Sequence, residues 1–232
     1  MSAQDASTIA SQWTGRWCWT QKHLSRPWNT YAYFRRTVEL PTKPQSAIVR
    51  ISADARYTLY VNGKRIHEGP ARSFPTSQSY DTLDLANVLQ AGKNAICAIV
   101  HQFGLPTFQS IYRDASGFLL DGVIDLTDQQ IPLHTPEGWV CRAATAWRKD
   151  VARRTVQLGF QEHFDAADDV VGWMSPDYAA TEDNGWKRPF DIGPVGVHPW
   201  LMMEARGVPL LAQHEESFQS VVAQFVGENA RG

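Results

Sequence analysis

The chain has 232 residues, of which 43% are hydrophobic and 20% charged, so it can bury a substantial core and is not a disordered segment. Its 22 Lys and Arg residues are outnumbered by 24 Asp and Glu, which excludes the basic excess that nucleic acids and anionic membrane surfaces require. No basic start followed by an apolar stretch marks an export signal, and no apolar run is long enough to span a bilayer.

Strand signatures follow a small, polar stretch at residues 1–12, which we expect to be a flexible tail. Residues 31–40 are rich in aromatic and β-branched side chains and stop at Pro41, and residues 48–53 repeat this composition. Both segments are predicted to be strands.

A β-hairpin is predicted next. Residues 56–61 run directly into Asn62-Gly63, and residues 64–68 supply the return strand. Asn-Gly is the dipeptide best suited to the two positive φ angles of a type I′ turn, so this segment is a turn rather than an active-site loop.

The segment at residues 95–100 is apolar on both of its alternating faces. That composition is typical of a strand in the middle of a sandwich, with both faces covered. Residues 81–90, just before Gly92, fit either a single helical turn or a loop.

Further strands are predicted at residues 117–126 and 138–142. Between Gly15 and Leu201 strand signatures recur about every ten residues, and no strongly amphipathic long helix interrupts them. This pattern predicts an all-β protein, an antiparallel β-sandwich rather than an α/β arrangement.

The end of the chain fits two forms. After Glu215 and Glu216, the apolar residues fall at helical spacing: Phe218, Val221, Val222, Phe225 and Val226. The same stretch also fits an extended strand, so the form of residues 213–232 stays open. We expect a terminal element that leads toward another domain.

Three widely spaced cysteines, Cys18, Cys97 and Cys141, lie beside apolar or aromatic residues. We expect buried thiols rather than a disulfide framework or a metal site, which suits a reducing compartment. The chain as written is predicted to be cytoplasmic, with a periplasmic or secreted location as the alternative if a signal has been removed.

The sequence contains no recognisable catalytic or metal-binding motif. The seven histidines are scattered, and there is no nucleophile elbow, P-loop or dinucleotide-binding glycine motif. We predict no cofactor and no transition metal. A structural calcium ion is left open, although the chain has no loop signature for one.

One acidic cluster resembles a hydrolase pair. Glycoside hydrolysis needs two carboxylates that face each other across a bond, and Glu162 with Asp165 or Asp168 could take those roles. In a strand, however, Glu162 and Asp165 point to opposite faces, and Asp168 and Asp169 fit a turn. The structural interpretation is preferred, and a small glycosidase using Glu162 and Asp165 is the alternative.

Candidate carbohydrate contacts lie in the loop at residues 101–114. Sugars stack on aromatic rings while their hydroxyl groups bond to carboxylates, amides and Arg. The residues that offer this chemistry are Phe108, Tyr112, Arg113 and Asp114, with Trp28 and Tyr31 elsewhere in the chain. A long sandwich loop whose rings cover the edge of the core is the structural alternative.

A family resemblance rests on the order of several motifs. These include Tyr33-Phe-Arg-Arg36, Ser52-Ala-Asp-Ala-Arg-Tyr57, Tyr60-Val-Asn-Gly63, Gly69-Pro-Ala-Arg72, Tyr80-Asp-Thr82, the segment 89–94, Gln161-Glu-His-Phe-Asp-Ala166, Gly172-Trp173 and Gly185-Trp186. Together they resemble the N-terminal β-sandwich region of bacterial α-L-rhamnosidases and related glycoside hydrolases. Ala167 stands where that family commonly has Arg. The sugar-binding domain of β-galactosidase and β-glucuronidase type enzymes is the second choice.

The resemblance implies a galactose-binding-like jelly roll over residues 13–209, with short helical turns and a C-terminal extension or linker at 210–232. It also implies that the catalytic glutamates lie in an α/α barrel absent from this chain. We therefore expect a non-catalytic accessory domain that binds carbohydrate, including rhamnose-containing glycans, or packs on the catalytic domain of a larger polypeptide. A purely structural interaction module is the alternative.

Overall fold

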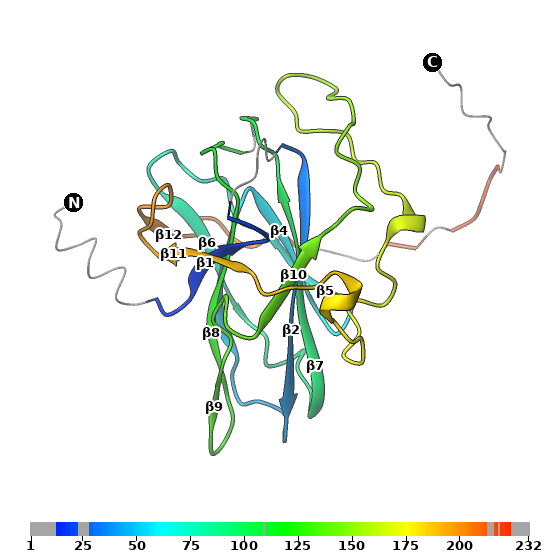
Figure 1. Ribbon diagram of the computed structural model, residues 1–232. Helices are drawn as coiled ribbons and strands as arrows, with labels where there is room; N and C mark the ends of the chain where they lie inside the picture. The colour runs from blue at the N-terminus through cyan, green and yellow to red at the C-terminus, as the bar shows by residue number, and fades with distance from the viewer. Residues whose placement is uncertain (1–12, 23–27, 109, 213–215, 218, 224–232) are drawn as a thin grey trace.

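A computed structural model describes residues 13–22, 28–108, 110–212, 216–217 and 219–223. Within these residues twelve strands form two sheets that lie against each other (Figure 1). The seven-stranded sheet runs in the order β11 (Phe190–Pro194), β1 (Arg16–Trp19), β8 (Gly117–Asp125), β3 (Ile48–Asp54), β6 (Gln78–Asp84) and β12 (Met203–Ala205), with β9 (Gln130–Pro132) beside β8. The five-stranded sheet runs in the order β10 (Trp139–Ala143), β2 (Thr30–Leu40), β7 (Gly92–Gln102), β4 (Arg56–Val61) and β5 (Lys64–Gly69).

This arrangement confirms the predicted antiparallel jelly-roll sandwich. Every pairing within the two sheets is antiparallel except that of β12 with β6. Among the described residues the helical elements are two 3-10 turns, η1 (Ala166–Asp168) and η2 (Glu182–Asn184). No helix in the described part of the chain has the length and apolar character needed to cross a membrane.

The hairpin prediction is confirmed at Asn62-Gly63. Strands β4 and β5 are joined by these two residues, with φ angles of 52° and 79°. Glycine accepts a positive φ without strain, and Asn tolerates it. The Asn62 side chain also accepts a hydrogen bond from the backbone of Ala95, which ties the turn to β7.

Strand β7 lies in the middle of its sheet, as the sequence predicts. It pairs with β2 in unbroken register, from Thr30 opposite Gln102 to Leu40 opposite Gly92. One face of this sheet packs in the core between the sheets, and the opposite face packs under the segment 144–186. Two covered faces explain why residues 95–100 need no polar side.

The segment 144–186, which we call the cover, packs on the outer face of the five-stranded sheet through aromatic rings. Trp173 stacks on Tyr33 with ring centres 4.3 Å apart, and Trp186 lies 5.9 Å from Trp173. Both tryptophans are buried. The Gly-Trp motifs at 172–173 and 185–186 therefore place side chains in a second core rather than on a binding surface.

Two predicted details are corrected. Residues 81–84 belong to β6, and residues 85–89 form a hydrogen-bonded turn, in which the Leu85 carbonyl accepts from the backbone of Leu89, rather than a helix. The stretch at 161–165 is not a strand, because beyond one isolated bridge at Phe164 it has no ladder partner among the described residues. Asp165 instead caps η1 by accepting a hydrogen bond from the backbone of Ala167.

The cysteines and the C-terminal segment complete the comparison. Cys18, Cys97 and Cys141 are free and buried, as predicted, and burial raises the pKa of Cys97 to about 11 and that of Cys141 to about 12. Residues 216–217 and 219–223 are neither helix nor strand, and Val221 and Val222 are exposed. Phe218, Phe225 and Val226 lie outside the described residues.

Candidate functional site

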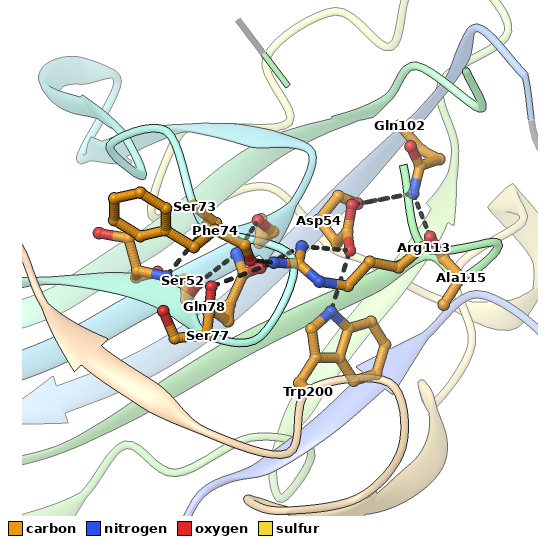
Figure 2. Close-up of polar contacts among 12 residues, drawn as sticks. Ser52, Asp54, Ser73, Phe74, Ser77, Gln78, Gln102, Arg113, Ala115 and Trp200 are labelled. Carbon is orange, nitrogen blue, oxygen red and sulfur yellow. Dashed lines mark hydrogen bonds and ion pairs between the residues drawn. The ribbon is translucent and has the colours of Figure 1, made fainter. Parts of the chain in front are cut away.

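A buried carboxylate marks one end of the sandwich. Asp54, the last residue of β3, accepts a hydrogen bond from Trp200 Nε1 at 3.0 Å, and Arg113 Nη1 lies 3.5 Å from the same oxygen (Figure 2). Gln102 Nε2 approaches the other oxygen at 3.4 Å. Burial raises the pKa of Asp54 to about 6, against the opposing effect of these donors.

Arg113 links the loop at 103–113 to the seven-stranded sheet through hydrogen bonds at the start of β6. Its guanidinium also donates to Gln78 Oε1 at 2.8 Å, to the Ser77 carbonyl at 3.1 Å and to the Phe74 carbonyl. Figure 2 shows the side chain extended between Asp54 and these acceptors. Its side chain is only 7% exposed, and its guanidinium N–H groups are bonded to acceptors inside the protein.

A hollow of about 780 Å³, which we call the end hollow, opens beside this network. The end of β3, the start of β4, the end of β5 and the start of β6 all reach it, because antiparallel strands bring alternate ends to the same side. The loop at 69–73, the described residues of the loop at 103–113 and the segment 206–212 complete its wall. Phe108, at 67% exposure, offers an accessible ring there.

A buried ion pair between Arg206 and Asp81 holds the segment that follows β12 in the wall of this hollow. Arg206 Nε donates to Asp81 Oδ1, and the Arg206 backbone amide donates to the Tyr80 carbonyl at 2.9 Å. Burial alone would raise the pKa of Asp81, but hydrogen bonds from His67, Arg206 and Tyr57 lower it overall. The carboxylate therefore stays ionised and holds the wall in place.

A second hollow, the face hollow, lies on the outer face of the five-stranded sheet and measures about 470 Å³. Tyr31 is stacked there between His101, at 3.8 Å, and Trp147, at 4.6 Å between ring centres. Burial raises the pKa of Tyr31 and lowers that of His101, so both rings stay neutral near pH 7. The two hollows share the lining residues Arg56, Glu68 and Phe103, so they are neighbours.

The six predicted carbohydrate contacts are divided among different places. Phe108 and Arg113 line the end hollow, and Tyr31 lines the face hollow. Asp114 lines a third hollow of about 310 Å³ beside Trp200 and accepts a hydrogen bond from the Tyr112 hydroxyl at 2.5 Å.

Trp28 lies apart from all three hollows. Its ring is 49% exposed and meets Phe160 edge-on at 6.2 Å. The structure thus joins two of the six predicted residues, Phe108 and Arg113, in one hollow and separates the others.

The acidic cluster is likewise divided. Glu162 lines the face hollow, whereas Asp165 lines none of the three. Arg148 pairs with Asp165 and, at 2.8 Å, with Asp168, and its hydrogen bond lowers the pKa of Asp165. Position 167, where the resembled family commonly has Arg, is Ala in this chain. Arg148 supplies a guanidinium to the acidic cluster instead.

Several lining residues were not singled out from the sequence. Arg56, Arg72 and Phe103 border the end hollow, and Arg206 holds its wall. Arg56 and Arg72 lie in the motifs around the hairpin, but a charged residue near a turn usually indicates only a solvated loop. Within the described residues no group of three or more His, Cys, Asp or Glu could hold a metal ion.

An all-β sandwich of two antiparallel sheets defines the class of jelly-roll, galactose-binding-like domains. The family profile for the alpha-L-rhamnosidase N-terminal domain matches residues 42–192. The chain therefore belongs to the alpha-L-rhamnosidase N-terminal domain family, as the order of its motifs predicts. A comparison with curated proteins found no match.

Solved structures agree with this family. The GH78 rhamnosidase of Bacillus sp. GL1 is 30% identical, with a TM-score of 0.72 over 85% of this chain and 20% of that one. The α-L-rhamnosidase of Aspergillus terreus is 17% identical, with a TM-score of 0.63 over 83% of this chain and 22% of that one. The chain thus spans about a fifth of the length of these enzymes.

A lectin shares the fold. The lectin from Pleurotus ostreatus, solved in complex with GalNAc, is 23% identical, with a TM-score of 0.55 over 85% of this chain and 46% of that one. At this identity the likeness concerns the architecture of the sandwich alone.

Proposed function

We propose that the chain is a non-catalytic accessory domain of an α-L-rhamnosidase-like glycoside hydrolase, which holds carbohydrate in the end hollow and packs on a catalytic α/α barrel elsewhere in a longer polypeptide. Its family membership and its share of about a fifth of the related enzymes support this role. The end hollow, which is lined by the exposed ring of Phe108 and by polar groups, is the observation that carries the binding half.

The end hollow suits a sugar in size and in chemistry. Its volume of about 780 Å³ falls within the range of ordinary ligand sites. An exposed aromatic ring can stack on the CH face of a sugar, while Arg56, Glu68, Arg72 and Ser110 offer groups for its hydroxyls. Arg113 would act by positioning the loop that carries Phe108, because its own donors are already bonded.

The remaining predicted contacts have separate roles in this proposal. Tyr31 would serve the adjoining face hollow, where Trp147 and Glu162 supply a ring and a carboxylate. Trp28, Tyr112 and Asp114 lie outside both hollows and stay predictions. Rhamnose-containing glycans are the ligands that the family suggests.

A structural interaction module is a second candidate, favoured by one observation. Val208, Leu210 and Leu211 line the end hollow and are 57%, 48% and 74% exposed. Apolar side chains gathered at a rim are typical of a surface that another domain covers.

Titration of the chain with rhamnose-containing oligosaccharides tests the binding half. We expect saturable heats and chemical-shift changes at millimolar sugar or below, and at least a fivefold weakening in Phe108→Ala, an estimate of about 1 kcal/mol for one stacked ring. Phe74→Ala is the matched control, because Phe74 is 65% exposed but lines none of the three hollows. If no sugar produces heat or shifts, the chain is a structural module and the binding half is wrong.

A further inference from the structure

The end hollow carries an excess of positive charge that its own walls do not neutralise. Four guanidinium groups but only two carboxylates line it, although the chain as a whole has a net charge of -2. The guanidinium groups belong to Arg56, Arg72, Arg113 and Arg206, and the carboxylates to Asp54 and Glu68.

Two of these guanidinium groups are already paired. Arg113 faces Asp54 at 3.5 Å, and Arg206 is bonded to Asp81 behind the wall. Glu68 is paired with Arg65, which lies outside the lining of this hollow. Neither remaining positive charge is therefore balanced by the carboxylates of the site.

Arg56 and Arg72 are the unpaired cations. Both side chains are exposed, and neither makes an ion pair or hydrogen bond within the described part of the chain. The guanidinium of Arg56 lies over the ring of Phe103, 4.8 Å from its centre, and this contact leaves its edge donors free. A guanidinium edge presents two parallel N–H groups, the geometry that a carboxylate accepts.

We propose that the end hollow binds an acidic sugar, a pyranose that carries a carboxylate, with Arg56 and Arg72 receiving the carboxylate and Phe108 the face of a ring. The inference deepens the proposed carbohydrate-binding function and depends on it. An acidic peptide has the same charge but no pyranose face for Phe108, so the exposed ring favours the sugar.

The test uses one ligand in two charge states. The chain is titrated by calorimetry with an α-1,4-linked galacturonate trimer, with the fully methyl-esterified trimer, and with a triglutamate peptide as the acidic non-sugar. We expect the acid trimer to bind about tenfold more tightly than its ester at low ionic strength, and the difference to shrink as salt is added.

Charge-neutral variants locate the contact. Arg56→Gln and Arg72→Gln should each weaken binding of the acid trimer about threefold to tenfold and leave binding of the ester unchanged. Arg154→Gln removes the same charge from an exposed residue outside the three hollows and should change both affinities by less than about twofold.

Each contrary outcome has a distinct meaning. Equal affinity for the acid and the ester, unaffected by the two arginine variants, overturns the acidic-sugar inference but leaves carbohydrate binding intact. Triglutamate binding as tightly as the acid trimer overturns the assignment to a sugar. Absence of binding by both trimers and by rhamnose-containing oligosaccharides overturns the inference and the binding function together.

Discussion

The clearest test of the fold concerns Arg35, a cation buried without a counter-ion. Its side chain is 0% exposed and points from β2 into the cover on the outer face of the five-stranded sheet. It donates to the carbonyls of Trp173, Ser175 and Tyr178 at 2.9, 2.8 and 3.0 Å, and no carboxylate among the described residues pairs with it. With the Pro176 carbonyl at 3.4 Å as a fourth acceptor, backbone carbonyls thus take the place of a carboxylate.

Arg35→Met keeps the length of the side chain and removes its donors. A hydrogen bond from a charged group contributes about 1.5–3 kcal/mol, but removing the cation also removes the cost of burying it, several kcal/mol. Each buried carbonyl left without its donor costs about 1–3 kcal/mol, so after the relief from burying the cation is subtracted we expect a net loss of about 2–4 kcal/mol. Arg35→Lys keeps the charge but reaches fewer carbonyls, so its free energy of unfolding should lie between those of Arg35→Met and the native chain.

Urea unfolding followed by tryptophan fluorescence measures the free energy of unfolding, and hydrogen exchange of residues 173–178 reports the cover. Arg142→Met is the control, because Arg142 donates to a single carbonyl, that of Asn184, at 2.7 Å, and its loss should cost about 1 kcal/mol or less. If Arg35→Met costs no more than this control, or if exchange at 173–178 is unchanged, the proposed role of Arg35 is wrong.

Three shorter predictions concern other parts of the sandwich. In Gly117→Ala, the new Cβ would lie 2.6 Å from Trp200 Cη2, so we expect a loss of about 1–3 kcal/mol in urea unfolding, and a neutral result would contradict this packing. Arg206→Met leaves the buried Asp81 carboxylate without its guanidinium; the loss of stability should be larger at pH 7 than at pH 4, where the carboxyl group can take up a proton, and equal losses at both pH values would refute it. The pKa of His101 is lowered well below 6.5 by burial, so its contribution to stability is complete above about pH 6.5 and is lost as the pH falls below that value. The free energy of unfolding should therefore decline less between pH 7 and pH 5.5 in His101→Gln than in the native chain, and identical declines would show that His101 is not responsible.

The local elements of this protein can be read from its sequence because their causes are local. Asn62-Gly63 supplies two residues that accept positive φ angles, and these are found at the turn between β4 and β5. The apolar run at 95–100 predicts a strand covered on both faces, and β7 has that environment. The order of such motifs along the chain was enough to predict the family.

The strand geometry assumed for residues 161–165 was wrong, although the structural interpretation of the acidic cluster did not depend on it alone. Alternation of side chains indicates a strand only where a neighbouring strand completes the ladder, and among the described residues that stretch has one isolated bridge. Arg148, distant in sequence from Asp168 and Asp165, holds the acidic cluster in a turn instead. Pairing of this kind has no local sequence pattern.

The turns, the strand alternation and the all-β sandwich follow from the sequence, since each depends on neighbouring residues. Which side chains meet at the end of that sandwich depends on how distant strands pair and pack. Asp54 and Trp200 are 146 positions apart in the chain, yet they share a hydrogen bond at the end hollow. Arg113, one of the predicted carbohydrate contacts, lines the hollow but uses its donors inside the protein, because the register of the sheets places Asp54 and Gln78 within its reach. Arg56 and Arg72 differ from the other charged residues that line the hollow because each of those others has an ion-pair partner in the tertiary structure.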